Sequence, residues 1–302
     1  MRCKKNKHRK KMLRVLVVGY DKMLNALISG SVYSGHKVVG ALRCDRVNYS
    51  KFTLFLKDIF APSHDYSLLK AFGVYDIKAP SINSEEFVKE FKKLEPDVIL
   101  VGSWAERIRA DIASLPKLGC INCHPSLLPR HRGANPYFQA IFSGEDLTGV
   151  TFHYVNEKFD CGDILLQEAV TIDDDMTAGD LRNRCSKFAQ GLVGELLNKL
   201  ERGEIVPQKQ DESRATYEKQ IEFKDTIVDL RKSKKDIHNH IRALRPWYMP
   251  IFRLNSRKID IKAHRFLALN DKYASVSIGS KVFENNKIII IRALDCLVEI
   301  TK

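Results

Sequence analysis

Long hydrophobic runs are missing from this chain of 302 residues. No apolar stretch reaches the roughly 18 residues that a membrane-spanning helix requires, so we expect no membrane insertion. The glycine-rich pattern G-x-G-x-x-G is also absent, because the buried run LRVLVVGY offers the single glycine Gly19, and Asp21 and Lys22 occupy the turn that follows. Without that pattern, a dinucleotide-dependent oxidoreductase is disfavoured.

A secretory signal is absent as well. The basic stretch MRCKKNKHRKK leads into LRVLVVGY without a small-residue cleavage site, so we interpret residues 1–12 as a solvated tail, with Met1 and Met12 both open as the start. Seven cysteines, an odd number without secretory context, favour a reducing, cytoplasmic location. Cys120 and Cys123 have C-x-x-C spacing, but no second pair lies at ligand spacing, so we expect no metal.

The charge balance is strongly basic. The chain has 50 Lys and Arg against 37 Asp and Glu, a formal net charge of +13, which suits an acidic partner such as tRNA or a nucleotide sugar. Basic runs are often only solvated faces, so charge alone leaves tRNA binding open. The cations that we expect to meet phosphates are Arg231, Lys232, Lys234, Lys235, Arg242, Arg245, Arg253, Arg257 and Lys258.

Apolar runs alternate with helical patterns over the first part of the chain. LRVLVVGY, HKVVGALRC and PDVILVGSW indicate buried strands, and residues 22–34 and 84–96 indicate helices, the second with Ser84 as its N-cap. This alternation predicts an α/β fold with a doubly wound, mostly parallel, Rossmann-like sheet. Apolar residues at helical spacing from Thr177 to Leu200 predict a long helix that closes this domain.

Composition divides the chain into four parts. After the tail of residues 1–12, we assign 13–202 to the α/β domain and 203–251 to a polar linker and helical segment. Residues 252–302 are predicted to form a small β-rich domain, from the short runs KIDIKA, YASVSIG and KIIIIRALDCLVEI. Whether this last part is a complete barrel stays open.

The most informative stretch, GCINCHPSLLPRHRGANP, runs from Gly119 to Pro136. Asn122 and His124 alternate at the end of its short apolar strand, so both side chains leave the strand on one face. An amide and an imidazole at a strand's C-terminal end suit a carbonyl oxygen that gains negative charge. Each residue alone is better explained as a strand end or a core histidine.

Within this stretch, HPSLLPRHRG resembles the SLLPxxRG signature of the formyltransferases that use 10-formyltetrahydrofolate. A second stretch, TGVTFHYVNEKFDCGDILLQ, is similar to the family's D-x-G-x-[IV]-[IL]-x-Q motif. The resemblance implies three catalytic residues, Asn122, His124 and Asp160. In the chemistry that we expect, an amine attacks the formyl carbon while Asn122 and His124 donate hydrogen bonds to the anionic oxygen. Asp160 would favour the charged form of His124 and help to relay the amine's proton.

The resemblance also implies where the folate binds. In the family, the loop after the PDVILVGSW strand holds the pteridine ring through backbone groups, and the SLLP segment forms a wall of the site. Trp104 is equally well explained as a core aromatic residue. The residues that match these two segments are Trp104, Ala105, Glu106, Arg107, Ile108, Ser126, Leu127, Leu128 and Pro129.

One further stretch bears on which amine accepts the formyl group. It reads ATYEKQIEFKDTIVDLRKSKKDIHNHIRALRPWYMP and is similar to the matching stretch of methionyl-tRNA and sugar formyltransferases. The resemblance implies a cytoplasmic enzyme of one-carbon metabolism that formylates initiator methionyl-tRNA for translation initiation in protein biosynthesis. The segment NYSKFTLFLKDIF lacks the basic insert by which those enzymes reach the acceptor stem. The alternative is a sugar-nucleotide N-formyltransferase acting on a nucleotide-linked amino sugar. A weaker alternative is a non-catalytic nucleic-acid-binding protein of the same fold.

Overall fold

The computed structural model describes residues 11–43, 64–254 and 257–301. Residues 1–10 of the basic tail and the segment NYSKFTLFLKDIF lie outside these ranges, as do the predictions made for them. The four-part division drawn from composition stays a prediction. By its internal contacts the chain forms two compact units, the first within Met1–Arg132, Gly149–Glu168 and Arg184–Ala215, the second within Gly133–Thr148, Ala169–Asn183 and Thr216–Lys302.

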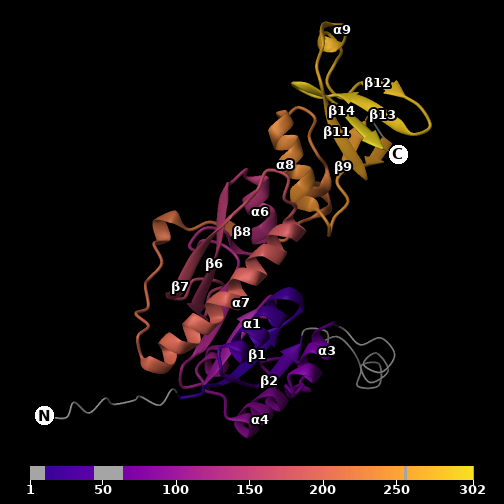
Figure 1. The fold of residues 1–302 in the computed structure, drawn as a ribbon. Helices are drawn as coiled ribbons and strands as arrows, with labels where there is room; N and C mark the ends of the chain where they lie inside the picture. Colours follow the sequence, from indigo (N-terminus) through magenta and orange to yellow (C-terminus); the bar gives the residue numbers. More distant parts are fainter. Residues whose placement is uncertain (1–10, 44–63, 255–256, 302) are drawn as a thin grey trace, which may run out of the picture. The chain divides into compact units, whose positions relative to one another are not determined.

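A six-stranded sheet has most of its residues in the first unit (Figure 1). The strand order is β2-β1-β3-β4-β6-β7, with β1 parallel to β2 and β3, and β3 parallel to β4. Strand β4 pairs antiparallel with β6, so the predicted mostly parallel sheet is confirmed. The strands are β1 (Arg14–Gly19), β2 (Lys37–Arg43), β3 (Val98–Gly102), β4 (Cys120–His124), β6 (Leu147–Tyr154) and β7 (Ile164–Thr171).

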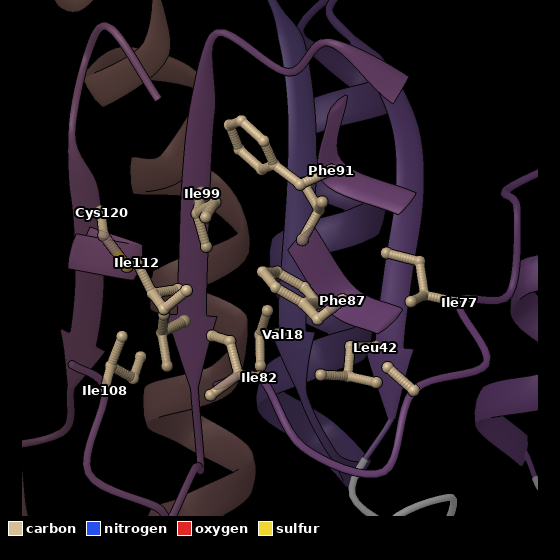
Figure 2. Packing of buried hydrophobic residues seen from close by; sticks show 13 residues of the cluster. Val18, Leu42, Ile77, Ile82, Phe87, Phe91, Ile99, Ile108, Ile112 and Cys120 are labelled. Carbon is tan, nitrogen blue, oxygen red and sulfur yellow. The ribbon is translucent and has the colours of Figure 1, made fainter. Parts of the chain in front are cut away.

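Helices cover both faces of this sheet, as a doubly wound fold requires. On one face, α1 lies against β3 and α7, because a Cβ atom on Gly102 would meet Met23 and one on Gly30 would meet α7. On the other face, Phe87 of α4 packs with Val18 and Ile99 in a cluster of buried side chains (Figure 2). The helices are α1 (Asp21–Tyr33), α3 (His64–Ala71), α4 (Glu85–Leu94), α5 (Ala110–Ala113) and α7 (Ala178–Arg202).

The helix boundaries follow local signals in the sequence. Ser84 caps α4 as predicted, since its hydroxyl accepts a hydrogen bond from the backbone N–H of Phe87 at 3.2 Å. The helix ends where Glu95 adopts a left-handed backbone with φ 44°. In the described part of the chain, none of the helices has the length and apolar character to cross a membrane.

The second unit has its own apolar core, which includes Ile237, Phe252 and Ile291. Helices α6 (Pro136–Phe142) and α8 (Lys234–Leu244) belong to this unit, with two short antiparallel sheets, β10-β9 and β11-β14-β13-β12 (Figure 1). The predicted β-rich character is therefore confirmed. The strands are β9 (Ile251–Leu254), β10 (Arg257–Asp260), β11 (Ala263–Ala268), β12 (Lys281–Glu284), β13 (Ile288–Arg292) and β14 (Cys296–Thr301).

Two predictions for this unit are wrong. The run YASVSIG is not a strand: Tyr273 and Ala274 end the short helix α9 (Asp271–Ala274), and Ile278 is 39% exposed. Alternating apolar residues form a strand only where a neighbouring strand accepts their backbone bonds. Within this run Gly279, its last residue, is bonded to a strand residue, with its N–H donating to the carbonyl oxygen of Arg292, while residues 273–278 belong to none of the described sheets. Arg242 is not a surface cation, because it is buried and its guanidinium donates to the carbonyl oxygens of Asp173 and Met176.

Candidate active site

The three predicted catalytic residues lie together in the first unit. Asn122 and His124 are on β4, and Asp160 is in the turn between β6 and β7, with a left-handed backbone at φ 56°. His124 and Asp160 are only 5% and 8% exposed. The sequence therefore brings an amide, an imidazole and a carboxylate into one nearly buried cluster.

Asn122 is committed to two partners through its amide nitrogen. Its Nδ2 donates to Oδ1 of Asp160 at 3.1 Å, and it lies 3.1 Å from Nε2 of His153. Since a carboxylate oxygen only accepts, the nitrogen rather than the oxygen of the amide must face Asp160. Both amide hydrogens are thus in use, and one must turn away before Asn122 can donate to a substrate oxygen.

His124 has a ring orientation that fixes its tautomer. Nε2 lies 2.8 Å from the carbonyl oxygen of His131, which can only accept, so Nε2 carries the proton. Nδ1 then faces Oδ1 of Asp160 at 3.5 Å. Burial lowers the pKa of His124, and it outweighs the Asp160 carboxylate and the His131 carbonyl, which act to raise it. Contrary to our expectation, His124 is held toward its neutral form.

His153 is a further member of the cluster that our sequence reasoning missed. On β6 it pairs directly with Asn122 across the antiparallel ladder. Its Nδ1 donates to the carbonyl oxygen of Tyr154 at 2.9 Å, which leaves Nε2 facing Oδ1 of Asp160 at 3.4 Å. The available signal was a histidine inside a buried strand, otherwise uncharged, that leads into the Asp160 turn.

The two sequence motifs are bonded to each other. Gln167, the last residue of the Asp160 motif, donates from Nε2 to the carbonyl oxygen of Leu128 at 3.0 Å and to Thr151 Oγ1 at 2.8 Å. Thr151 in turn donates to the carbonyl oxygen of Ser126 at 2.6 Å. These bonds hold the SLLP segment against β6 and β7 and give it a single conformation.

Most side chains of the SLLP segment are turned inward. Ser126, Leu128 and Pro129 are buried, and Leu127 is half-buried. The hydroxyl of Ser126 donates to the carbonyl oxygen of Arg130 at 2.7 Å. The segment thus forms a rigid wall, and its contact with folate stays a prediction.

The second predicted folate segment, residues 104–108, is fixed from behind. Glu106 accepts hydrogen bonds from Ser81 and from Asn83, whose Nδ2 lies 2.8 Å away, and the same nitrogen donates to the carbonyl oxygen of Arg107 at 2.8 Å. Glu106 is therefore directed into the protein. Ile108 is buried and Trp104 is half-buried against the Figure 2 cluster, whereas Ala105 and Arg107 are exposed. Binding of the pteridine ring by the backbone groups of residues 104–108 stays a prediction.

The C-x-x-C pair has the features of structural cysteines. Cys120 and Cys123 are both buried, and burial raises the pKa of each thiol, which disfavours the thiolate that metal binding or redox exchange requires. Among the described residues, no group of three or more His, Cys, Asp or Glu is arranged to hold a metal ion.

Known proteins match this chain over most of its length. The sequence pattern of the family described as Formyl transferase matches residues 14–197. The methionyl-tRNA formyltransferase of Halothermothrix orenii is 37% identical over 58% of this chain, and that of Thermotoga maritima is 33% identical over 76%. These alignments span 55% and 72% of the two relatives, so the chain matches little more than half the length of the first.

Solved structures with the same fold are more distant in sequence. An N-formyltransferase from Helicobacter canadensis, solved with folinic acid and dTDP-3-aminofucose, has a TM-score of 0.67 at 17% identity. The match covers 96% of this chain and 100% of that one. HypX from Aquifex aeolicus has a TM-score of 0.66 at 15% identity and is covered over 45% of its length. At this identity the likeness establishes the fold.

Proposed function

This chain belongs to the formyl transferase family, and on that premise we propose that it transfers the formyl group of 10-formyltetrahydrofolate to a primary amine. The observation that carries the proposal is the cluster of Asn122, His124 and Asp160, joined at 3.1 and 3.5 Å. Acyl transfer to an amine needs a base for the amine's proton and donors for the oxyanion. The cluster contains both kinds of group.

His124 is suited to take up the proton. The acceptor nitrogen attacks the formyl carbon and becomes positively charged in the tetrahedral intermediate, so it must lose a proton. Neutral His124 has its lone pair on Nδ1, and protonation there places the new N–H toward Oδ1 of Asp160 at 3.5 Å. Asp160 thereby stabilises the imidazolium that forms. Collapse of the intermediate breaks the bond between the carbon and N10 of the folate, and N10 takes a proton as tetrahydrofolate leaves.

Asn122 is the group that we assign to the oxyanion. One of its amide hydrogens must leave Asp160 or His153 for this purpose. Asp160 would then need another donor, and protonated His124 supplies it. This coupling gives a reason for the three side chains to act as one unit.

For the acceptor we favour the amino group of initiator methionyl-tRNA. The proposal draws on the T. maritima and H. orenii relatives, which are named methionyl-tRNA formyltransferases, and on the net charge of +13. Lys232, Lys235 and Arg253 of the second unit are exposed, and exposed cations can meet phosphates, which supports a polyanionic acceptor.

A nucleotide-linked amino sugar is the second candidate. It is supported by the H. canadensis N-formyltransferase, which this chain matches over 100% of that protein's length. Both acceptors require the same folate chemistry.

An acceptor panel tests the proposal. Purified protein with 10-formyltetrahydrofolate is offered methionyl-tRNA or dTDP-linked amino sugars, and formylated product is measured by mass spectrometry. We expect methionyl-tRNA to be formylated with the highest kcat/KM. A higher value for an amino sugar selects the second candidate, and no product with any amine contradicts the transferase assignment.

A further inference from the structure

One glutamine outside the catalytic cluster holds the turn that carries Asp160. The Nε2 of Gln210 donates to the carbonyl oxygens of Asp160 and Gly162, each at 2.8 Å. Gln210 lies in the stretch that composition assigns to a linker, 50 residues along the chain from Asp160. Both of its amide hydrogens are directed at the backbone of a single turn.

The other end of the same amide is held by Arg132. Gln210 Oε1 accepts from Arg132 Nη2 at 2.7 Å and from Nε at 3.0 Å. Because a guanidinium only donates and a carbonyl only accepts, the amide of Gln210 has a single orientation that satisfies both sides. No other side chain of this length offers a double acceptor on one side and a double donor on the other.

Arg132 is itself fixed. Its side chain is fully buried, and its Nη1 and Nη2 donate to the two carboxylate oxygens of Glu212 at 2.9 and 2.7 Å. Glu212 also supplies the opposite charge that a buried guanidinium requires. Glu212, Arg132, Gln210 and the Asp160 turn thus form a continuous hydrogen-bonded chain within the first unit, which we name the clamp.

The turn that the clamp holds has little support from its own backbone preference. Asp160 is in the left-handed region at φ 56°, which residues other than glycine adopt reluctantly. At Gly162, an added Cβ atom would lie 1.7 Å from the carbonyl oxygen of Tyr154, so the turn is pressed against β6. Such a turn keeps its conformation only when the surrounding structure over-determines it.

We propose that Gln210 is a positioning residue, which through the clamp fixes the Asp160 carboxylate against His124 and Asn122. This inference rests on the proposed formyl transfer for its kinetic consequence. The Asp160 contacts that it protects are 3.1 Å to Asn122 Nδ2 and 3.5 Å to His124 Nδ1. A displacement of about 1 Å at such contacts can slow a reaction by about 100-fold.

Two substitutions of Gln210 distinguish its hydrogen bonds to the Asp160 turn from those that it accepts from Arg132. Gln210→Met has similar length and no charge but loses every hydrogen bond of the amide. Gln210→Glu keeps acceptors for Arg132 but turns an oxygen toward the carbonyl oxygens of Asp160 and Gly162. We expect both to lower kcat by about 10- to 100-fold, with the KM for the formyl donor changed less than about threefold.

The matched control is Gln208, two residues away and exposed. Its backbone N–H and carbonyl pair with Ile164, so Gln208→Met and Gln208→Glu leave that bridge in place. We expect both control variants to keep kcat within about twofold of wild type, since exposed side chains contribute little to the site. Wild-type kcat in Gln210→Glu would overturn the proposal, because this variant loses the bonds to the turn and puts a repelling oxygen in their place, while Arg132 keeps its acceptor. Equal losses in the Gln208 variants would overturn it as well.

A second readout does not depend on turnover. In protein without substrate, the ring nitrogens of His124 are titrated by NMR. Since the Asp160 carboxylate raises the pKa of His124, a displaced carboxylate should move the titration midpoint to lower pH in Gln210→Met and not in Gln208→Met. An unchanged midpoint in Gln210→Met would overturn the clamp even in an active enzyme. A shifted midpoint in a protein that formylates no amine would support the clamp and reject the proposed function.

Discussion

His124 combines a buried ring with one nitrogen that has no proton. Nε2–H is bonded to the His131 carbonyl at 2.8 Å, and burial lowers the pKa of the ring. A neutral imidazole is what a base requires, and the nearby carboxylate of Asp160 limits how far the pKa falls. The balance between burial and Asp160 therefore sets the pH below which the base is lost.

We expect Asp160→Asn to move that pH. As a base, His124 is active when neutral, so kcat/KM falls as the pH drops through its pKa. Removal of the carboxylate removes an influence that raises this pKa, so the acidic limb of the pH profile should shift to lower pH. The plateau of kcat/KM should also fall by about 100-fold or more, since the imidazolium loses its partner. Steady-state rates across the acidic range measure both effects.

Asp163→Asn in the same turn is the control for this prediction. It makes the same chemical change three positions away, and the backbone bond from Tyr154 N–H to the Asp163 carbonyl is kept. We expect a profile like that of wild type. An acidic limb that stays in place in Asp160→Asn, or moves to higher pH, contradicts the assignment of His124 as the base.

The residues of the site differ in how visible they are in the sequence. Asn122, His124 and Asp160 could be named from two motifs, because each lies at a strand end or in a turn next to diagnostic neighbours. His153 could not, since its place beside Asn122 depends on the register between β4 and β6. The roles of Gln210 and Gln167 depend on the folded loops, and nothing local in the sequence specifies the carbonyl groups that they meet.

At the scale of elements, helices α1 and α7 are in close contact at Gly30 of α1. A Cβ atom on Gly30 would lie 2.3 Å from the carbonyl oxygen of Gln190 and 2.3 Å from Cγ1 of Val193. The close approach brings the hydroxyl of Ser29 within 3.0 Å of Gln190 Nε2, which donates to it. The helix pair depends on a residue without a side chain at this crossing.

We expect Gly30→Ala to destabilise the protein by roughly 1–3 kcal/mol, because the crowded methyl group must push backbone atoms apart. This loss should exceed the gain of about 1 kcal/mol that alanine brings to a helix interior. Urea-induced unfolding measures the difference in the free energy of unfolding.

Gly191→Ala on α7 is the matched control for Gly30→Ala. No atom lies within 4 Å of its added Cβ, so only the gain in helix propensity of up to about 1 kcal/mol should appear. Equal changes in the free energy of unfolding in the two variants would contradict this prediction, because they would mean that α1 and α7 can move apart without a loss of stability.

The elements could be predicted where pattern and partner agree. Buried strands such as LRVLVVGY and the Ser84-capped helix follow from local signals that the sheet then satisfies. YASVSIG has the alternation of a strand, but only Gly279 at its end has a backbone hydrogen bond to a strand residue, and Tyr273 and Ala274 belong to helix α9 instead. Long-range pairing, which single-sequence patterns do not encode, decides such cases.

At the scale of the whole molecule, the surface charge of the second unit bears on the acceptor. Of the cations proposed to meet phosphates, Arg242 is buried, and Arg231 is paired with Asp229 at 2.9 Å. Lys232, Lys235 and Arg253 are exposed. A polyanion would find its contacts among exposed groups of this kind.

We expect the affinity for methionyl-tRNA to fall by more than about 30-fold between roughly 50 and 200 mM salt, as at least about four phosphate contacts imply. Lys232→Gln with Lys235→Gln should flatten the slope of log affinity against log salt by about 1.4 to 1.8. Filter binding over a salt series measures the slope.

The control for the salt series is a lysine pair on α4, Lys89→Gln with Lys92→Gln. These residues are exposed in the other unit, so the same change in net charge should leave the slope as it is. Equal flattening in both double variants would indicate a general effect of net charge. A shallow dependence in wild type would favour the nucleotide sugar, which carries two phosphates.

The clamp also has a consequence for the protein during its synthesis. Arg132 finds its partners 78 and 80 residues further along the chain, at Gln210 and Glu212. Domains begin to fold from the N-terminus while the ribosome is still adding about 5–20 residues per second. Strands β1 to β4 can pair during that time, but the Asp160 turn has no clamp until Glu212 has left the exit tunnel. In the nascent chain the first strands can therefore pair before the Asp160 turn is held, and the clamp is completed only after residue 212 of the 302 has emerged.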